Sequence, residues 1–332
     1  MDQSNKLCRI GLGIAVMLLM ASTAPPAEAV TDCSFTVIGP TYQLDADCFT
    51  DATLLVPDGF TLDGRGHTIL AVDPSGGHFV GAVVANGGST AHVKNLVVTA
   101  DMLDNVCDGG DDRLRGIMFD GASGSITHTT VTGINKGASG CQEGNAIEVR
   151  NAPFDGTHPD TTTVEVSHND IIDYQKTGIV ANGDVNVSIN HNKISASATQ
   201  ENLAANSIQL GFGAMGAVVQ NQIDGNQWKG TSDTAATAIL LFSSDAANAS
   251  DNNIRGNSDI GIYEFGMDSL LRNNRVFDEG ADDPNSGYDI GIGLYGTDST
   301  AKNNKVRGFD LPYDGVTGGK NKVIPGPQNF NP

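Results

Sequence analysis

The chain has 332 residues, of which 19 are basic and 39 acidic, so its formal net charge is -20 at pH 7. Nucleic acid and anionic membrane surfaces both require a basic footprint on the protein, and this charge balance disfavours them as partners. Forty-one glycines, twelve prolines and a single tryptophan indicate a chain with many turns and few long elements, and no change in composition marks a linker between domains.

The first 29 residues have the layout of a secretory signal peptide. Lys6 and Arg9 precede an apolar run from Ile10 to Met20, and Ala27-Glu28-Ala29 forms a small-x-small cleavage site. The apolar run is too short to span a bilayer. We therefore predict a secreted or periplasmic protein that has no membrane span after signal removal.

Four cysteines remain after the signal: Cys33, Cys48, Cys107 and Cys141. In an oxidising compartment they allow three pairings. We favour Cys33 with Cys48, and Cys107 with Cys141 because that pair lies in loops of neighbouring repeats at matching places. A thiol nucleophile or a metal site would need a histidine at ligand spacing, and we find none. Residues 30–55 are predicted to cap the first coil, held by the first disulfide.

Two short phrases recur through the centre of the chain. One is a small residue followed by Ile and alternating residues, as in Gly116-Ile117-Met118-Phe119-Asp120, and its isoleucines are Ile117, Ile147, Ile179, Ile208, Ile239, Ile262 and Ile292. The other is Asn, a variable residue and then Val or Ile, and it begins at Asn95, Asn169, Asn192, Asn221, Asn252, Asn274 and Asn304, with a Thr variant at Thr129. The isoleucines recur every 23 to 32 residues, and a recurrence at this period is typical of stacked structural repeats.

The phrases predict short strands rather than helices. Each alternates apolar and polar residues over about five positions, and Gly, Asn and Asp separate one phrase from the next. Without long amphipathic helices between them, such strands favour an all-β solenoid, a parallel β-helix, over a leucine-rich repeat. Asn tolerates the left-handed backbone of tight turns, and in coils stacked about 4.8 Å apart its side chains could bond each other in a ladder.

A longer phrase carries a family resemblance. It reads Val56-Pro57-Asp58-Gly59-Phe60-Thr61-Leu62-Asp63-Gly64-Arg65-Gly66-His67-Thr68-Ile69. Together with the Asn-x-Ile coils it resembles the right-handed parallel β-helix proteins of the pectate-lyase-like superfamily. The resemblance implies a single-stranded right-handed parallel β-helix over residues 56–306, with a closing segment or tail at 307–332. That superfamily holds lyases, glycosidases, epimerases, phage tailspikes and adhesins.

The longer insertions enter the coil at one corner, between an Asn phrase and the next Gly-Ile strand. They span residues 99–115, 133–145, 196–206, 225–237 and 278–289, and we expect them to form a wall beside the Gly-Ile strands. One further insertion, residues 152–161, leaves from the other end of its strand and could form the opposite wall. Since each Ile should face inward, the residues one before, one after and three after it are expected to form the floor of a groove.

The expected floor is charged near its start and aromatic towards its end. The candidate catalytic residues are Asp120, Glu148, Arg150 and Glu143, because carboxylates can act as acid or base. The candidate substrate contacts are Asn182, Gln209, Trp228, Tyr263 and Arg115. Asp111 and Asp112 are candidate Ca²⁺ ligands. In the lyases that this fold resembles, an Arg or Lys often acts as base beside Ca²⁺, and Arg150 is the nearest match.

Simpler interpretations stand beside these. Glu148 and Arg150 could form an ordinary surface ion pair, and the acidic loops could simply be solvated. The aromatic floor could be an exposed apolar strip. The chain also lacks the Gly-His-Gly phrase of polygalacturonase-type hydrolases and the Trp-Ile-Asp-His phrase of pectate lyases.

We therefore expect a secreted β-helix that acts on extracellular polysaccharide as a uronate-polymer lyase or epimerase. The alternative is a non-catalytic carbohydrate-binding or surface-interaction protein. An enzyme needs Asp120, Glu148, Arg150 and Glu143 to converge on one hollow, whereas a binder needs only a line of aromatic and amide groups. A third interpretation, periplasmic copper delivery, needs Met and His clusters, and this chain has only scattered ones.

Overall fold

The protein is described here by a computed structural model that covers residues 30–152, 160–197, 203–230, 234–280 and 287–325. The expected signal peptide lies outside the described residues, as does most of the insertion at 152–161. Among the described residues, no helix is long and apolar enough to cross a membrane.

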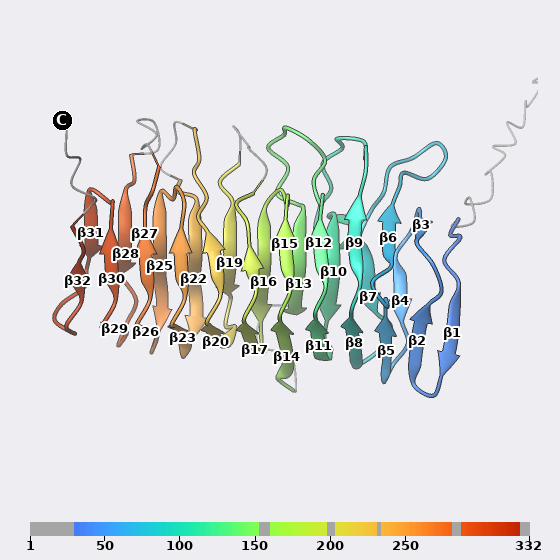
Figure 1. The fold of residues 1–332 in the computed structure, drawn as a ribbon, viewed down its shortest axis with the longest axis horizontal. Helices are drawn as coiled ribbons and strands as arrows, with labels where there is room; N and C mark the ends of the chain where they lie inside the picture. The colour runs from blue at the N-terminus through green and yellow to red at the C-terminus, as the bar shows by residue number, and fades with distance from the viewer. Residues whose placement is uncertain (1–29, 153–159, 198–202, 231–233, 281–286, 326–332) are drawn as a thin grey trace, which may run out of the picture.

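Three long sheets wrap around one axis, and the chain visits them in turn (Figure 1). Sheet C contains β4 (Leu54–Val56), β7 (Ala82–Asn86), β10 (Arg115–Asp120), β13 (Asn145–Asn151), β16 (Thr177–Gly183), β19 (Asn206–Gly211), β22 (Thr237–Asp245), β25 (Ile260–Met267), β28 (Ile290–Leu294) and β31 (Leu311–Asp314). Sheet B contains β1 (Phe35–Ile38), β2 (Thr41–Leu44), β5 (Phe60–Asp63), β8 (Thr90–Lys94), β11 (Ser123–Thr127), β14 (Thr162–Ser167), β17 (Val185–Asn190), β20 (Met215–Val219), β23 (Ala247–Ser250), β26 (Leu270–Arg272) and β29 (Thr300–Lys302). Sheet A contains β3 (Cys48–Thr50), β6 (Thr68–Ala71), β9 (Val97–Ala100), β12 (Thr130–Thr132), β15 (Asp170–Ile172), β18 (Lys193–Ile194), β21 (Gln222–Asp224), β24 (Asn253–Arg255), β27 (Arg275–Phe277), β30 (Lys305–Arg307) and β32 (Lys322–Val323).

The isoleucines of the first phrase stack in register along sheet C. Ile117 pairs with Ile147, and the same alignment continues through every later coil to Ile292. All of these isoleucines are buried. Burying each aliphatic side chain stabilises the fold by about 1.5–3 kcal/mol. The predicted parallel β-helix is therefore confirmed.

The small residue before each Ile also faces the core, so the prediction that it lies on the groove floor is wrong. A Cβ added at Gly116 would lie 2.6 Å from Val131 of sheet A, and one added at Gly261 would lie 2.2 Å from Val276. The chain turns from sheet A into sheet C at this point, and two consecutive residues point inward before alternation begins. Only a small side chain fits such a corner.

A ladder of buried asparagines runs between sheets B and A, as predicted. Each Asn Nδ2 donates to the Oδ1 of the next Asn at 2.9–3.1 Å, and the ladder contains Asn169, Asn192, Asn221, Asn252, Asn274, Asn304 and Asn321. Asn95 is not a member. Val98, rather than Val97, pairs with Val131, so the ladder position on that coil is Leu96, and Asn95 occupies the preceding left-handed corner with φ +52°.

The coil extends beyond both expected boundaries. Strands β2, β3 and β4 pair in parallel with β5, β6 and β7, so a complete coil precedes Val56. Strand β1 adds an antiparallel partner to β2 and covers that edge of sheet B, and the Cys33–Cys48 disulfide closes the segment. At the other end, β31 and β32 continue sheets C and A past Val306.

Candidate functional site

The five long insertions predicted at one corner all lie between sheet A and sheet C, and most project from the upper edge of the stack in Figure 1. The further insertion between β13 and β14 joins sheet C to sheet B, also as predicted. Two of them, residues 101–114 and 133–144, are joined by the predicted Cys107–Cys141 disulfide. The shared corner is confirmed, and these two loops stand next to the charged start of sheet C.

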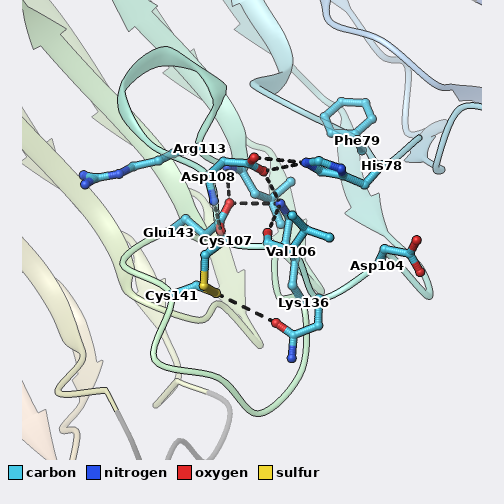
Figure 2. Close-up of polar contacts among 12 residues, drawn as sticks. His78, Phe79, Asp104, Val106, Cys107, Asp108, Arg113, Lys136, Cys141 and Glu143 are labelled. Atoms are coloured by element: carbon cyan, nitrogen blue, oxygen red, sulfur yellow. Dashed lines mark hydrogen bonds and ion pairs between the residues drawn. A yellow bond between two sulfur atoms is a disulfide. The ribbon is translucent and has the colours of Figure 1, made fainter.

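A buried charge cluster holds these two loops together (Figure 2). The Lys136 Nζ lies 2.7 Å from an Asp108 oxygen and 3.1 Å from Glu143 Oε2, and His78 Nε2 lies 3.0 Å from Asp108. Burial opposes the charge of Asp108, but hydrogen bonds from Lys136 and His78 outweigh it and lower the pKa of this carboxyl. The cluster therefore depends on an ionised Asp108.

Glu143 belongs to this cluster and not to the groove. It has no exposed surface, and its carboxylate accepts hydrogen bonds from the backbone N–H groups of Asp108 at 3.0 Å and Leu114 at 2.8 Å. Glu143 thus positions the loop in front of β10, and its expected convergence with the other candidate catalytic residues is wrong. The sequence could not show this, because the Lys136 partner lies in the same irregular loop.

The other three candidate residues do converge on the outer face of β10 and β13. Arg150 donates to Asp120 Oδ2 from Nε at 3.0 Å and from a terminal nitrogen at 2.8 Å. Its guanidinium also lies 3.9 Å from Glu148 Oε1. Glu148 and Arg150 are 4% and 7% exposed, so the interpretation of an ordinary surface pair is wrong.

Arg115 shapes the wall above them. Its Nε donates to Glu148 Oε2 at 2.5 Å, and its terminal nitrogens donate to the carbonyl oxygens of Gly110, Asp111 and Arg113 at 2.8–3.1 Å. The loop thus folds back over a guanidinium that the sheet presents. Arg115 is 2% exposed, so its main role is to hold the loop in place.

The candidate Ca²⁺ ligands lie in a single 3-10 turn, Gly110–Asp112. Asp111 Oδ1 accepts a hydrogen bond from Arg150 at 2.6 Å, and this bond lowers the pKa of Asp111. Within the described ranges, the groups of three potential metal ligands all include cysteines already joined in disulfides. Ca²⁺ binding by Asp111 and Asp112 stays a prediction.

A pocket of about 370 Å³ lies at the foot of this wall, with Glu148 and four cationic side chains, those of Arg113, Arg115, Arg150 and Lys176, in its lining. In a chain of net charge -20, this excess of cations is a local reversal of sign. Arg113 has a buried Nε with no hydrogen-bond partner in the described part of the chain. The pocket is therefore suited to an anion.

Lys176 is a pocket residue that sequence reasoning missed. Burial, and then repulsion by Arg113, lower its pKa to about 8. Its Nζ donates to the Ala204 carbonyl at 2.5 Å. The one available signal was its place in a short connection between β15 and β16, directly beside the Gly-Ile strand.

The floor of the pocket carries amides. Gln209 bridges Asn182, to whose Oδ1 it donates at 3.3 Å, and Asn206, from which it accepts at 3.2 Å. Asn182 and Gln209 both line the pocket, and their contact with a substrate stays a prediction.

An aromatic row continues from the pocket along the coil axis. Phe212 lines the pocket and lies 5.9 Å from Phe242, which stacks on Phe265 at 6.1 Å between ring centroids. The three rings are 46%, 38% and 49% exposed. Tyr263 packs edge-to-face against Tyr295 at 5.3 Å on the same sheet. The floor is thus charged at one end and aromatic at the other, as expected.

Trp228 is not part of this row, so its predicted contact with substrate is wrong. It is 8% exposed and packs in a small cluster with Ala204 and Ala236. Loop residues next to it bury the indole, and its face is unavailable for stacking on a sugar. A lone Trp in a long loop served here as the anchor of that loop.

Comparison with known proteins concerns the fold. No protein-family model matches the chain, and neither does any curated protein sequence. The structure of the Dettilon tailspike protein is similar, with a TM-score of 0.50 and 14% identity over 86% of this chain and 55% of that chain. This chain therefore spans about half the length of the tailspike protein.

The structures of two enzymes have lower TM-scores. The DFA-IIIase from Arthrobacter chlorophenolicus A6, in complex with DFA-III, has a TM-score of 0.47 and 11% identity over 88% of this chain and 78% of that one. The periplasmic alginate epimerase AlgG has a TM-score of 0.33 and 10% identity over 87% and 80%. At such identities the likeness concerns the fold alone, and the two lower scores add nothing to it. From its own coils and the tailspike likeness, the chain is a right-handed parallel β-helix repeat protein.

Proposed function

We propose that this protein acts on or holds an acidic extracellular polysaccharide, and that the pocket at the start of sheet C binds a uronate carboxylate. The observation that carries the proposal is the gathering of Arg113, Arg115, Arg150 and Lys176 around one pocket of an otherwise acidic chain. The predicted signal peptide would bring the protein to where such polymers occur, and the two disulfides are compatible with that compartment.

The groove offers each part of a uronate chain a suitable partner. A guanidinium matches the planar geometry of a carboxylate. The amides of Asn182 and Gln209 can bond sugar hydroxyls. The exposed row of Phe212, Phe242 and Phe265 offers flat apolar faces to the C–H faces of successive sugar rings. Binding would therefore run from the pocket along the coil axis.

In the lyase version, a base removes the proton on the carbon beside the carboxylate. The electron pair forms a carbon–carbon double bond, and the bond to the leaving glycosidic oxygen breaks as that oxygen is protonated. Lys176 is the best base, because burial lowers its pKa to about 8 and a fraction of it is neutral near that pH. An epimerase would instead return a proton to the opposite face of the same carbon.

Arg150 fits a different role from the one first expected. Burial disfavours its charged form, but the hydrogen bond to Asp111 and the charges of Asp120 and Glu148 raise its pKa. It therefore stays cationic, which suits neutralisation of the uronate carboxylate and not proton removal. Asp120 and Glu148 hold its guanidinium in place.

A non-catalytic binder is the second candidate, and a specific observation favours it. The guanidinium of Arg150 already bonds Asp120 and Asp111, and that of Arg115 bonds Glu148, so part of the cationic charge is neutralised. The rings of the aromatic row, by contrast, are 38–49% exposed. A protein that only holds a polymer needs this row more than the pocket.

The test uses purified protein and a panel of uronate polymers, with and without Ca²⁺. Absorbance of the conjugated double bond reports lyase product, and proton exchange at the same carbon reports epimerisation. We expect Lys176→Met to lower turnover by about 100-fold or more with little change in binding, and wild-type turnover to rise with pH through about 8.

A pair of matched variants tests whether the aromatic row binds the polymer, and product formation then separates the enzyme from the binder. Phe242→Ala should weaken binding, whereas Phe49→Ala, which removes an exposed ring from the outer face of sheet A, should not. Binding that depends on Phe242 but gives no product on any polymer would leave the binder. No binding by the wild type to any acidic polymer would exclude both candidates.

A further inference from the structure

A second cationic feature lies on another face of the molecule, at its C-terminal end. Strands β27, β30 and β32 of sheet A each begin with a cation on the outer face (red end of Figure 1). Arg275 pairs in register with Lys305, and Lys305 with Lys322. All three side chains are exposed. We call Arg275, Lys305 and Lys322 the basic ladder.

The fold itself does not require cations at these positions. The same column of sheet A carries Thr130, Asp170 and a single cation, Lys193, in earlier coils, and Gln222 and Asn253 in later ones. Like charges directly opposite each other on neighbouring strands destabilise a sheet, and parallel strands are only about 4.8 Å apart. Three cations in a row therefore oppose the stacking that builds the coil.

The described part of the chain does not neutralise this ladder. Within the described residues, none of its three members forms an ion pair. The adjacent column behaves differently, because Arg255 and Arg307 share Glu279 at 3.6 and 3.1 Å. Glu279 is thus already engaged, and among the described residues no carboxylate is paired with the ladder.

The sequence around the ladder repeats in the last coils. Arg272-Asn273-Asn274-Arg275 and Lys302-Asn303-Asn304-Lys305 occupy the same corner, with the second Asn in the buried ladder. Arg272 and Lys302 pair in register on sheet B, so cations flank the corner on both sides. Arg272 also has a buried Nε with no hydrogen-bond partner in the part of the chain that the structure describes.

A hollow of about 540 Å³ lies at this corner, and its lining includes Arg275, Lys305 and the side-chain amides of Asn253, Asn273 and Asn303. One carboxylate, that of Asp251, is also part of the lining and accepts a hydrogen bond from Asn273 at 3.0 Å. Cations and amide donors at a regular spacing suit a series of anionic groups. They do not suit a single small anion.

We propose that the basic ladder and its hollow bind a linear acidic polysaccharide that runs along the coil axis on the outer face of sheet A. Its ligand class is that of the proposed function, but it uses none of the same residues. A nucleic acid is disfavoured by the net charge of -20 and because the aromatic face of Phe277, on β27, is already covered by the Arg307 guanidinium at 4.5 Å. The site would hold the polymer while the groove acts on another stretch of it.

The experiment is affinity electrophoresis of the full chain in gels that contain a uronate polymer. The variant Arg275→Gln/Lys305→Gln/Lys322→Gln should bind at least about 10-fold more weakly, and its binding should depend less on salt concentration. The control Lys193→Gln removes an exposed cation from the same sheet and column. It should behave like the wild type, whereas Lys305→Gln alone should weaken binding by a few fold.

Several outcomes would overturn the proposal. One is that the triple variant is retarded in the gel as strongly as the wild type. Another is that the Lys193→Gln control loses as much affinity as the triple variant does. Competition by single-stranded DNA as effective as that by uronate polymer would replace the polysaccharide with nucleic acid. An Arg150→Gln variant on the same gel separates the two sites. Loss with that variant alone would uphold the groove and remove the ladder, and loss with the triple variant alone would do the reverse.

Discussion

Two groups of cations, one around β10 and β13 and one in the last coils, differ in their burial and in their ion pairs. Around β10 and β13, Arg115 and Arg150 are almost completely buried, and each bonds a carboxylate. On β27, β30 and β32, the side chains of Arg275, Lys305 and Lys322 are exposed and form no ion pair within the described residues. The same residue types therefore serve different purposes at the two ends.

The difference follows from desolvation. A cation that a loop removes from water is tolerated only with a partner close by, because an unpaired buried charge costs several kcal/mol. An exposed cation keeps its hydration, and salt screens its neighbours. Paired and buried cations in this protein shape the loops and the pocket, whereas unpaired and exposed ones remain available to a ligand.

The largest effect that tests this comparison is expected from Lys136→Met. The change leaves the buried carboxylates of Glu143 and Asp108 without their cation, and we expect a loss of about 3–5 kcal/mol in the free energy of unfolding. Urea unfolding measures it. Lys305→Met, an equivalent change in the basic ladder, should alter stability by less than about 0.5 kcal/mol. Similar losses in both variants would contradict the comparison.

A smaller effect is expected from pH. The pKa of Asp108 is lowered in the folded state, where burial opposes its charge but Lys136 and His78 outweigh burial. Its contribution to stability is therefore present above the unfolded pKa of about 3.9 and is lost as pH falls through the folded pKa. Unfolding measured from pH 6 down to pH 3 should show this loss, and Asp108→Asn should flatten the profile.

The control for that profile is Asp298→Asn, which changes an exposed aspartate in a C-terminal turn. Its backbone is left-handed, with φ +56°, and Asn tolerates that conformation as well as Asp does. The control should keep the slope of the wild type. An equal flattening in both variants would mean that the loop cluster does not govern acid stability.

The smallest effect is expected from Asp111→Asn. The Asp111 side chain is 85% exposed although it bonds the buried Arg150, and an exposed ion pair contributes only about 0.2–1 kcal/mol. Thermal unfolding should shift by a few degrees at most. The same measurement with added Ca²⁺ tests the predicted ion site, because stabilisation by Ca²⁺ that disappears in Asp111→Asn would support it. No response to Ca²⁺ in the wild type would remove Asp111 and Asp112 as ligands.

Repetition made the fold predictable, because each coil restates the same packing rule. Seven isoleucines in similar phrases and a run of asparagines at a steady offset specify which residues stack, and the structure confirms the Ile column and the Asn ladder. Where a phrase was degenerate, the predicted ladder position was wrong by one residue. Asn95 fits the Asn phrase in the sequence, but the ladder position on that coil belongs to Leu96.

The site was only partly predictable, because its residues lie in loops that repeat nothing. Asp120, Glu148 and Arg150 lie on regular strands, so their register placed them correctly on the outer face of sheet C. Glu143 and Trp228 lie in insertions, and their burial depends on loop packing that has no periodic signal. Lys176 was missed for the same reason, since its lowered pKa comes from burial beneath those loops.

The sequence by itself determined the coil, its period, the inward Ile column, the Asn ladder, the two disulfides and the corner from which the long loops leave. These features are set by contacts between equivalent positions in neighbouring coils, which a repeat displays openly. Only the tertiary structure decided which charges are paired and buried and which stand free. That distinction depends on how far each loop folds over the sheet and excludes water, and residues distant in the chain jointly set it.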